Sequence, residues 1–328
     1  MSNIIVAELA ERDYNEYIKL LKELGWRISF ENISEILKEY RDTKYTSVII
    51  AKFDGKIVGR TILDTVFPPY SEIVNLAVHP RYRGMGVGTK IVLECIRRAT
   101  EKGFNIVYLM CDARNIEIHR FYSKLNFTPV IIGRSSEYVW VYNFTEQSFV
   151  GKFVKQHPFI EKHTNKTKAK FHGQKLYTIM YIDPLTRDML KIFLKGQPGQ
   201  PKNGTMPRIA AVKYNTKQLK AEIWITELTD EISRNKKAFF FLNIKNLSEK
   251  MLKVEVQPIK VDGVEICSEK SMKITVKPKE YEKIMYTVRL TKEFKIPIRL
   301  LSFQTITATL KLNIDNVEAV VSAGFSYR

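Results

Sequence analysis

The stretch RYRGMGVG at residues 81–88 constrains the fold more than any other part of the chain. It follows the apolar run IVNLAVHP and precedes TKIVLECIRRATEKG, so we expect a strand, a glycine loop and then a helix. Such a loop presents unpaired backbone N–H groups and the positive end of the helix dipole, which together bind phosphate. Glycines remove the side chains that would obstruct a pyrophosphate.

The order of residues in this stretch distinguishes among the phosphate-binding loops that precede a helix. A nucleotide P-loop requires Gly-Lys-Ser/Thr at the helix start, whereas residues 88–90 read Gly-Thr-Lys. The dinucleotide fingerprint G-x-G-x-x-G is also unmet, because Gly84 and Gly86 are followed by Thr89. The sequence RGMGVG at residues 83–88 satisfies a third pattern, Q/R-x-x-G-x-G/A.

A second segment, ARNIEIHRFYSKLNF at residues 113–127, is similar to the pattern N-x-x-A-x-x-F-Y-x-x-x-G-F. On these two motifs, residues 1–145 resemble a GNAT superfamily N-acetyltransferase, in that family's order of elements. Asn126 stands where the family has glycine. Asparagine is the next-best residue for a left-handed helix end, so we expect the fold to tolerate it.

The resemblance implies where acetyl-coenzyme A, the co-substrate of that family, binds. The loop would hold the pyrophosphate, the backbone of the preceding strand would bind the pantetheine arm, and an asparagine would contact the cofactor. The cofactor-binding residues implied in this way are Leu76, Ala77, Val78, Arg83, Gly84, Met85, Gly86, Val87, Gly88, Thr89, Asn115 and Tyr122. No metal is expected.

Acetyl transfer from a thioester to an amine requires a neutral amine, a stabilised oxyanion and a proton for the departing thiolate. Glu72 opens a strand that resembles the one carrying the catalytic glutamate in the histone-acetylating branch of the family. It would take the amine proton directly or through water, although many members use a chain of waters instead. The resemblance further implies that a backbone N–H near Val78 polarises the carbonyl and that Tyr122 protonates the thiolate. We assign no chemistry to Cys95 and Cys111, which we expect to be buried.

Residues 1–147 are predicted to form one mixed sheet flanked by helices. The predicted strands are 3–9, 72–78, 105–111 and 137–144, with a hairpin over 47–66 hinged at Asp54-Gly55, and the predicted helices are 12–25, 87–102 and 116–125.

Length and charge divide the rest of the chain. The 328 residues suggest two domains, or two domains and an insert, because domains commonly hold ~150 residues. Residues 1–150 are nearly neutral, whereas residues 151–220 hold 15 basic and 3 acidic side chains, a net charge of +12. We therefore predict three regions: an acetyltransferase domain over 1–147, a basic connecting region of strand and helix over 148–208, and a β-sandwich accessory domain over 209–328.

The connecting region is expected to contain a strand over 175–182, a short helix over 183–195 and a loop over 196–207. Asp183 would cap the helix, with Pro184 in its first turn and Gly196 just past its end. Lysines alternate with aromatic residues here, which is compatible with a surface for single-stranded nucleic acid or another polyanion, or with a merely solvated lysine face. The residues concerned are Lys152, Phe153, Lys155, Phe159, Lys168, Lys170, Phe171, Lys175 and Tyr177. The region's histidines, His157, His163 and His172, lack sequence neighbours typical of metal ligands and are expected at the surface.

From residue 209 onward the pattern is all-β. QTITATLKLNI at residues 304–314 alternates strictly, which places Ile306, Ala308 and Leu310 on a core face and Thr307 and Thr309 on the other face. Turn signals recur every ~10 residues, which is the spacing of a two-sheet sandwich. The region weakly resembles an immunoglobulin-like domain.

The whole sequence is therefore interpreted as an α+β protein. We expect an acetyl-CoA-dependent N-acetyltransferase that acts on a primary amine of a protein or small molecule by direct attack in a ternary complex. The alternative is a catalytically inactive coenzyme A sensor, or a polyanion-binding protein, built on the same fold. Three cysteines at wide spacing, no signal peptide pattern and no ~18-residue apolar run predict a cytoplasmic protein that does not enter membranes.

Overall fold

The structure, a computed structural model, describes residues 4–26, 37–38, 42–130, 138–165, 168–197, 205–268, 272–296 and 305–328. The chain divides into two compact units, Met1–Leu109 and Met110–Arg328. Within the described residues, no helix is both long and apolar enough to span a membrane.

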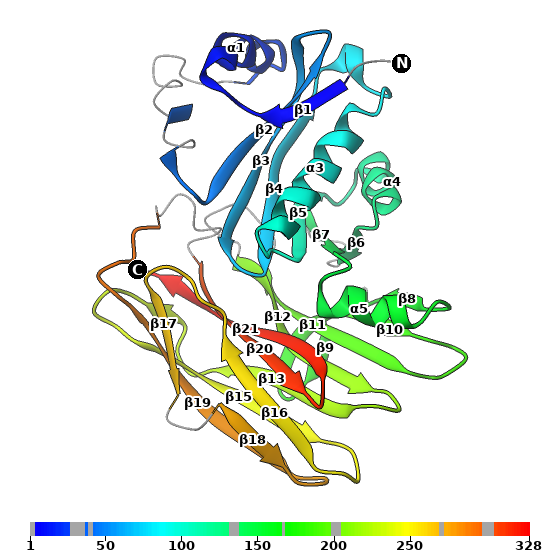
Figure 1. The fold of residues 1–328 in the computed structure, drawn as a ribbon, viewed down its shortest axis with the longest axis vertical. Coiled ribbons are helices and arrows are strands. Elements are labelled where there is room, and N and C mark those ends of the chain that lie inside the picture. Colours follow the sequence, from blue (N-terminus) through cyan, green and yellow to red (C-terminus); the bar gives the residue numbers. More distant parts are fainter. Residues whose placement is uncertain are drawn as a thin grey trace. The chain divides into compact units, whose positions relative to one another are not determined.

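The first unit is a mostly antiparallel sheet with helices packed on it (Figure 1). Its elements are β1 (Ile4–Glu8), a 3-10 turn (Glu11–Asp13), α1 (Tyr14–Glu23), β2 (Thr46–Phe53), β3 (Lys56–Phe67), β4 (Tyr70–Val78), a 3-10 turn (Pro80–Tyr82), α3 (Val87–Glu101) and the start of β5 (Ile106–Asp112). The strand order of the sheet is β1-β2-β3-β4-β5-β7-β6, where β6 is Thr128–Val130 and β7 is Tyr138–Phe144, and the division between the two units falls inside β5. Strand β5 runs parallel to β4, whereas β1 to β4 are antiparallel to their neighbours. The mixed sheet with flanking helices is confirmed.

Adjacent residues of β3 show that α1 and α3 cover opposite faces of this sheet. The Arg60 side chain reaches Tyr17 of α1, with its Nη2 atom 2.6 Å from the tyrosine hydroxyl. Gly59 faces α3, and a Cβ atom added there would lie 2.9 Å from Cδ1 of Ile91 and 3.0 Å from Cγ1 of Val87. The helix can sit this close to the sheet because Gly59 has no side chain.

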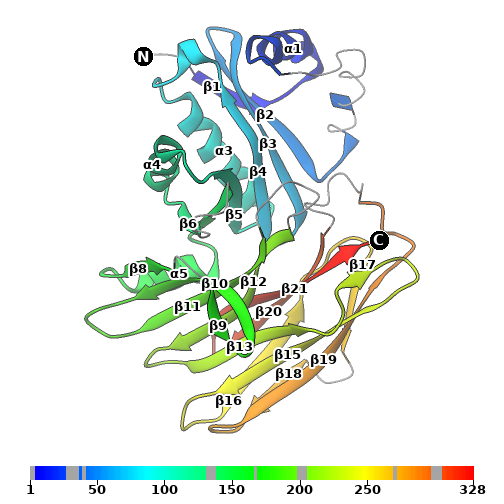
Figure 2. The same ribbon diagram turned by 180° about the vertical axis from the view of Figure 1, so that it is seen from behind.

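The second unit contains the end of β5, two helices and the remaining strands (Figure 2). The helices are α4 (Ile116–Lys124) and α5 (Phe149–Gln156). The strands are β6 (Thr128–Val130), β7 (Tyr138–Phe144), β8 (Glu161–Thr164), β9 (Ala169–Phe171), β10 (Gln174–Ile182), β11 (Met189–Gln197), β12 (Thr205–Asn215), β13 (Lys220–Glu227), β14 (Glu231–Ile232), β15 (Ala238–Asn246), β16 (Leu252–Pro258), β17 (Val264–Ser268), β18 (Lys273–Val276), β19 (Tyr281–Leu290), β20 (Thr305–Ile314) and β21 (Val317–Tyr327).

Two sheets make up most of this unit. One has the order β17-β19-β15-β13-β12-β11-β10-β8, with β9 paired to β10, and the other has the order β14-β21-β20-β16-β18. Strands β20 and β21 pack against β12 and β13, and the rings of Phe240 and Phe325 lie 6.3 Å apart between the sheets. The two-sheet β architecture matches the sequence pattern, while its likeness to an immunoglobulin domain stays a prediction.

The helix predicted over 183–195 is wrong. Residues 183–188 form a turn, in which Asp183 Oδ1 accepts bonds from the backbone N–H groups of Leu185 and Thr186, and β11 follows it. Asp183 and Pro184 suit a turn as well as a helix start, and pairing of β11 with both β10 and β12 decides the outcome. The boundary predicted between residues 208 and 209 falls inside β12. Most of the loop predicted over 196–207 lies outside the described residues.

The predicted core face of β20 is confirmed, since Ile306, Ala308 and Leu310 are fully buried. Thr307 and Thr309, on the opposite face, are buried as well. The Thr307 hydroxyl donates to Sδ of Met206 at 3.2 Å, so β12 also covers part of this second face.

We predict that Gly59→Ala lowers the free energy of unfolding by about 1–3 kcal/mol, because the added methyl group overpacks the contact with α3. Urea denaturation measures the loss. Ile91→Val removes the Cδ1 atom that the new methyl group would meet, so the double variant is expected to lose less than the sum of the single variants. A strictly additive loss would contradict this account of the contact.

Candidate active site

The glycine loop joins the end of β4 to the start of α3. Gly84 and Gly86 adopt φ angles of 75° and 82°, in the left-handed region that favours glycine. A Cβ atom added at either residue would meet no atom within 4 Å, so the space in front of the loop is open. The predicted role of the glycines as residues that keep this space clear is therefore consistent with the backbone.

The start of α3 is anchored in the core but has no side-chain N-cap. Val87 is 1% exposed, so its side chain belongs to the core and only its backbone can face a ligand. Gly86 provides no side-chain cap and the first turn holds no acidic residue. The N–H groups of this turn therefore have no partner within the helix, and no negative charge in the turn opposes an anion.

Arg83 connects the loop to β4. Its Nε atom donates to the carbonyl oxygen of Val78 at 3.2 Å, while the side chain remains exposed. Leu76, Ala77 and Val78 are half-buried at the end of the strand. The structure thus brings the predicted pantetheine strand and the predicted pyrophosphate loop together.

Strand β4 is irregular just before these residues. Asn75 has a φ of 56°, and the pairing of β4 with β3 shifts by one residue between Arg60 and Ile62. Buried Arg60 spans the irregularity, since its Nη1 atom donates to the carbonyl oxygen of Asn75 at 3.0 Å and its Nε atom donates to the hydroxyl of Tyr17 at 2.9 Å. Arg60 was not among the predicted site residues, although a lone arginine within an apolar strand is a usable signal.

The pairing between β4 and β5 stops early. It covers Tyr70 to Glu72 opposite Ile106 to Tyr108, and the described residues show no further pairing between these strands. Backbone groups beyond Glu72 on this side of β4 are therefore not engaged by β5. Backbone groups of this kind bind an extended ligand by hydrogen bonds, as a further strand would.

Glu72 belongs to a polar row that crosses four strands. Cross-strand pairing places Thr46, Asp64, Glu72 and Tyr108 side by side on β2, β3, β4 and β5. The Thr46 hydroxyl donates to Asp64 Oδ1 at 2.9 Å, and the Tyr108 hydroxyl donates to Glu72 Oε2 at 3.1 Å. Glu72 was predicted from the sequence and Asp64 was not, because the register between strands cannot be seen in the sequence of a single strand.

Asp64 binds its proton unusually tightly. Burial, and secondly the charge of Glu72, raise the pKa of Asp64 to about 7, against a smaller lowering by the Thr46 hydroxyl. Two adjacent carboxylates repel each other when both are ionised, so such a pair retains one proton near neutral pH.

The other predicted site residues, Asn115 and Tyr122, belong to the second unit. Asn115 caps α4, with its Oδ1 atom accepting from the N–H of Ile118 at 3.0 Å. Tyr122 is buried, and its ring meets that of Phe127 edge-on at 5.5 Å. Asn126 has a φ of 62°, which confirms the left-handed helix end expected there.

Burial governs both predicted core thiols. It raises the pKa of Cys95 to about 12 and the pKa of Cys111 to about 11, so both are neutral at pH 7. Within the described residues no group of three or more histidine, cysteine or acidic side chains is arranged to hold a metal ion.

The predicted surface position of one histidine is wrong. The side chain of His157 is only 11% exposed and its Nε2 atom lies 3.2 Å from Oδ2 of Asp188. The turn that replaces the predicted helix brings this aspartate to the end of α5, which the sequence separation concealed.

Comparison with known proteins assigns the first part of the chain. Residues 8–127 match the model of the acetyltransferase (GNAT) family. A protein of Archaeoglobus fulgidus described as an uncharacterized N-acetyltransferase is 32% identical over 83 residues, which are 24% of this chain. The match spans about half, 56%, of that relative's length. The N-terminal part of the chain therefore contains a GNAT acetyltransferase domain.

Two solved structures show the extent of the structural similarity. A probable acetyltransferase from Staphylococcus epidermidis has 17% identity and a TM-score of 0.38, and covers 44% of this chain and 99% of its own. The PaiA N-acetyltransferase from Thermoplasma acidophilum, solved in complex with coenzyme A, has 18% identity and a TM-score of 0.34, with coverages of 43% and 99%.

We predict that the effect of Asp64→Asn on the free energy of unfolding depends on pH. The substitution should be more stabilising, or less destabilising, at pH 8 than at pH 4. The folded-state pKa of Asp64 lies above its unfolded value, so the wild-type protein loses stability as the pH rises from about 4 to about 7, and asparagine removes that dependence. Urea denaturation of both proteins at the two pH values measures the difference. A difference in unfolding free energy that does not change with pH would contradict the prediction.

Proposed function

We propose that the protein is an acetyl-CoA-dependent N-acetyltransferase that acetylates a primary amine by direct attack in a ternary complex. One observation carries the proposal: an unobstructed glycine loop lies between the end of β4 and the uncapped start of α3. The family match over residues 8–127 supports the same reaction class. Acetyl-CoA supplies an activated thioester, and residues of the chain position it and transfer the protons.

The loop and the strand would position the co-substrate. Backbone N–H groups from Gly84 to Thr89 would bind a pyrophosphate, because they lie at the positive end of a helix and the space around Gly84 and Gly86 is open. Arg83 holds the loop to Val78 and adds a positive charge beside it. Leu76, Ala77 and Val78 offer backbone groups to the pantetheine arm.

In the chemical step a C–N bond forms as the thioester C–S bond breaks. Glu72 takes the proton that the amine loses, directly or through water, and Tyr122 supplies a proton to the departing thiolate. The backbone N–H near Val78 stabilises the oxyanion. Asp64 lies beside Glu72, and the two carboxyl groups titrate as a pair. The protonation of Asp64 therefore affects how readily Glu72 acts as a base.

We predict that Gly86→Trp abolishes coenzyme A binding, as measured by calorimetry, because the indole would fill the space before the loop. Gly103→Trp is a matched control. Gly103 lies beyond the other end of α3, has a φ of 83° against 82° for Gly86, and has equally open surroundings. Equal affinities in the two variants would remove the pyrophosphate assignment.

We predict that Tyr122→Phe slows turnover while coenzyme A affinity stays nearly unchanged. Phenylalanine keeps the ring packed against Phe127 but cannot protonate the thiolate. Release of free thiol from acetyl-CoA, followed with a panel of amines, measures turnover. An unchanged kcat would dismiss the role of Tyr122.

The same assay tests the proposed function itself. Turnover of the wild-type protein on any amine supports the transferase, and its dependence on the amine identifies the acceptor class. Tight coenzyme A binding without turnover on any amine would contradict the transferase and favour a sensor.

A further inference from the structure

The outer face of the nine-stranded sheet carries a line of charged residues that the acetyltransferase function does not use. Cross-strand pairing places Lys191, Lys213, Glu222, Lys245 and Tyr281 in register on β11, β12, β13, β15 and β19. We call these five residues the basic row. Paired residues point to the same face, and the row spans roughly 19 Å at the usual strand spacing of about 4.8 Å.

The basic row lies on the sheet face opposite the larger core, beside a smaller buried cluster that includes Phe193, Ala211 and Trp224. The alternate positions on the same strands, Ile192, Val212, Ile223 and Ile244, are fully buried. Of the row itself, Lys191, Lys213 and Lys245 are half-buried and Tyr281 is 46% exposed. The lysine stems thus lie along the sheet while their ammonium groups reach its surface.

The single acid of the row is already engaged. Glu222 accepts from Nζ of Lys213 at 2.7 Å, and its other oxygen lies 2.9 Å from Nε2 of His172. His172 reaches it because the turn after β9 folds over the sheet and stacks the imidazole on Trp224, with ring centroids 3.6 Å apart. Within the described part of the chain, Lys191 and Lys245 have no carboxylate partner.

Lys191 and Lys213 are placed unfavourably for a sheet with no ligand. They lie directly opposite each other on β11 and β12, and opposed like charges destabilise a strand pair. Burial, and secondly the charge of Lys213, lower the pKa of Lys191. A bound anion would offset the repulsion between these two ammonium groups.

Aromatic rings lie beside these cations. Trp224 stacks on Tyr281 with centroids 5.6 Å apart, and Lys191 lies 5.2 Å from the ring centre of Phe193. Lys283, next to the row, lies 3.7 Å from the ring centre of Phe241. Of these rings only that of Tyr281 is exposed, since Phe193 and Trp224 are buried and Phe241 is half-buried. An exposed ring next to lysines suits a ligand that is both anionic and flat.

We propose that the basic row is a binding surface for single-stranded nucleic acid, with phosphates on its lysines and a base stacked on Tyr281. A single phosphate would not need cations spread over several strands, and lysine favours phosphate contact over base reading. The net charge of +12 in residues 151–220 adds a long-range attraction. The proposal is independent of the acetyltransferase function.

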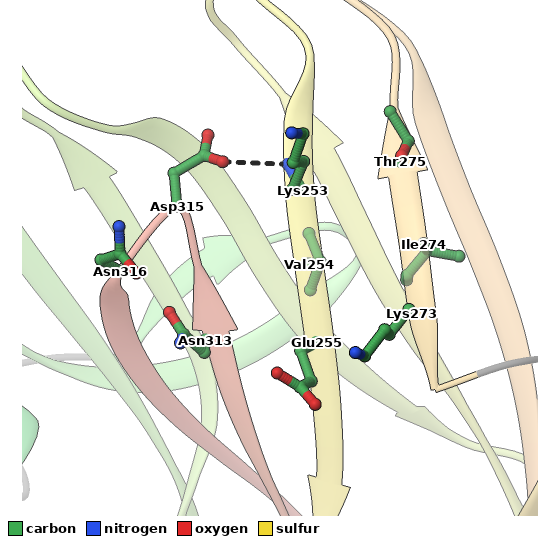
Figure 3. Close-up of a pocket in the computed structure, with 9 residues that line it drawn as sticks. All are labelled: Lys253, Val254, Glu255, Lys273, Ile274, Thr275, Asn313, Asp315 and Asn316. Carbon is green, nitrogen blue, oxygen red and sulfur yellow. Dashed lines mark hydrogen bonds between the residues drawn. The ribbon is translucent and has the colours of Figure 1, made fainter.

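The test compares two double variants with the same change in charge. Lys191→Gln/Lys245→Gln removes the two lysines without a carboxylate partner from the row. Lys253→Gln/Lys273→Gln is the control in the other sheet, where Figure 3 shows both lysines around a hollow that also holds Glu255 and Asp315. The probe is a fluorescein-labelled 12-nucleotide oligouridylate, and fluorescence anisotropy is recorded over a salt titration.

The wild-type protein should bind the oligonucleotide with an affinity that falls steeply with salt. The row variant should lose at least about tenfold in affinity, and its slope of log K against log salt should shrink by about 1.4, from about 0.7 per phosphate contact. The control should change affinity by less than about threefold. Tyr281→Ala should weaken binding about fivefold with an unchanged slope, because stacking does not depend on salt.

Three outcomes would overturn the proposal. These are no binding by the wild-type protein, equal losses in the row and control variants, and binding to phosphatidylglycerol vesicles without binding to oligouridylate or oligothymidylate. Circular dichroism of each variant establishes that it is folded. Coenzyme A binding should be the same in all of them, so failure here is distinguishable from failure of the transferase proposal.

Discussion

The close packing of α3 on β3 is the constraint on which the candidate active site depends. Gly59 lets Val87 and Ile91 approach the sheet so closely that even an added Cβ atom would lie 2.9–3.0 Å from their side chains. The helix start is thereby held beside the end of β4, and the two left-handed glycines complete the connection. The proposed phosphate site therefore consists of backbone N–H groups that have no partner within the helix, in a space that no side chain fills.

The sheet of the first unit contains a buried and a half-buried ionisable residue, Arg60 and Asp64, and their charges are compensated in different ways. Buried Arg60 meets a tyrosine hydroxyl and a strand carbonyl, so its charge is compensated and supports the irregular part of β4. Asp64 has one hydroxyl donor and a carboxylate neighbour, and no cation beside it is needed because a bound proton removes its negative charge. Stability and chemistry are linked here, because the pair that strains the sheet at high pH also contains the proposed base.

In the second unit, pairing across strands concentrates charge that is scattered in the sequence. Lys191, Lys213 and Lys245 are separated along the chain but stand in one cross-strand row, with Glu222 between Lys213 and Lys245 and the stacked rings of Trp224 and Tyr281 beside them. The linear alternation of lysine and aromatic residues does not itself form this surface. Phe153 and Tyr177, two of its aromatic members, are buried.

The sequence alone determined most elements of the first domain, though not β6, and the loop between β4 and α3, because helix periodicity, the Asp54-Gly55 hairpin and the glycine spacing are local signals. The alternation of residues in β20 likewise predicted which of its side chains lie in the core. Only the tertiary structure decided that residues 189–197 form a strand, since neighbouring strands on both sides outweigh a local helix signal. It also decided that Asp64 lies beside Glu72 and that the basic row exists, because cross-strand register depends on how distant segments pair and no single segment encodes it.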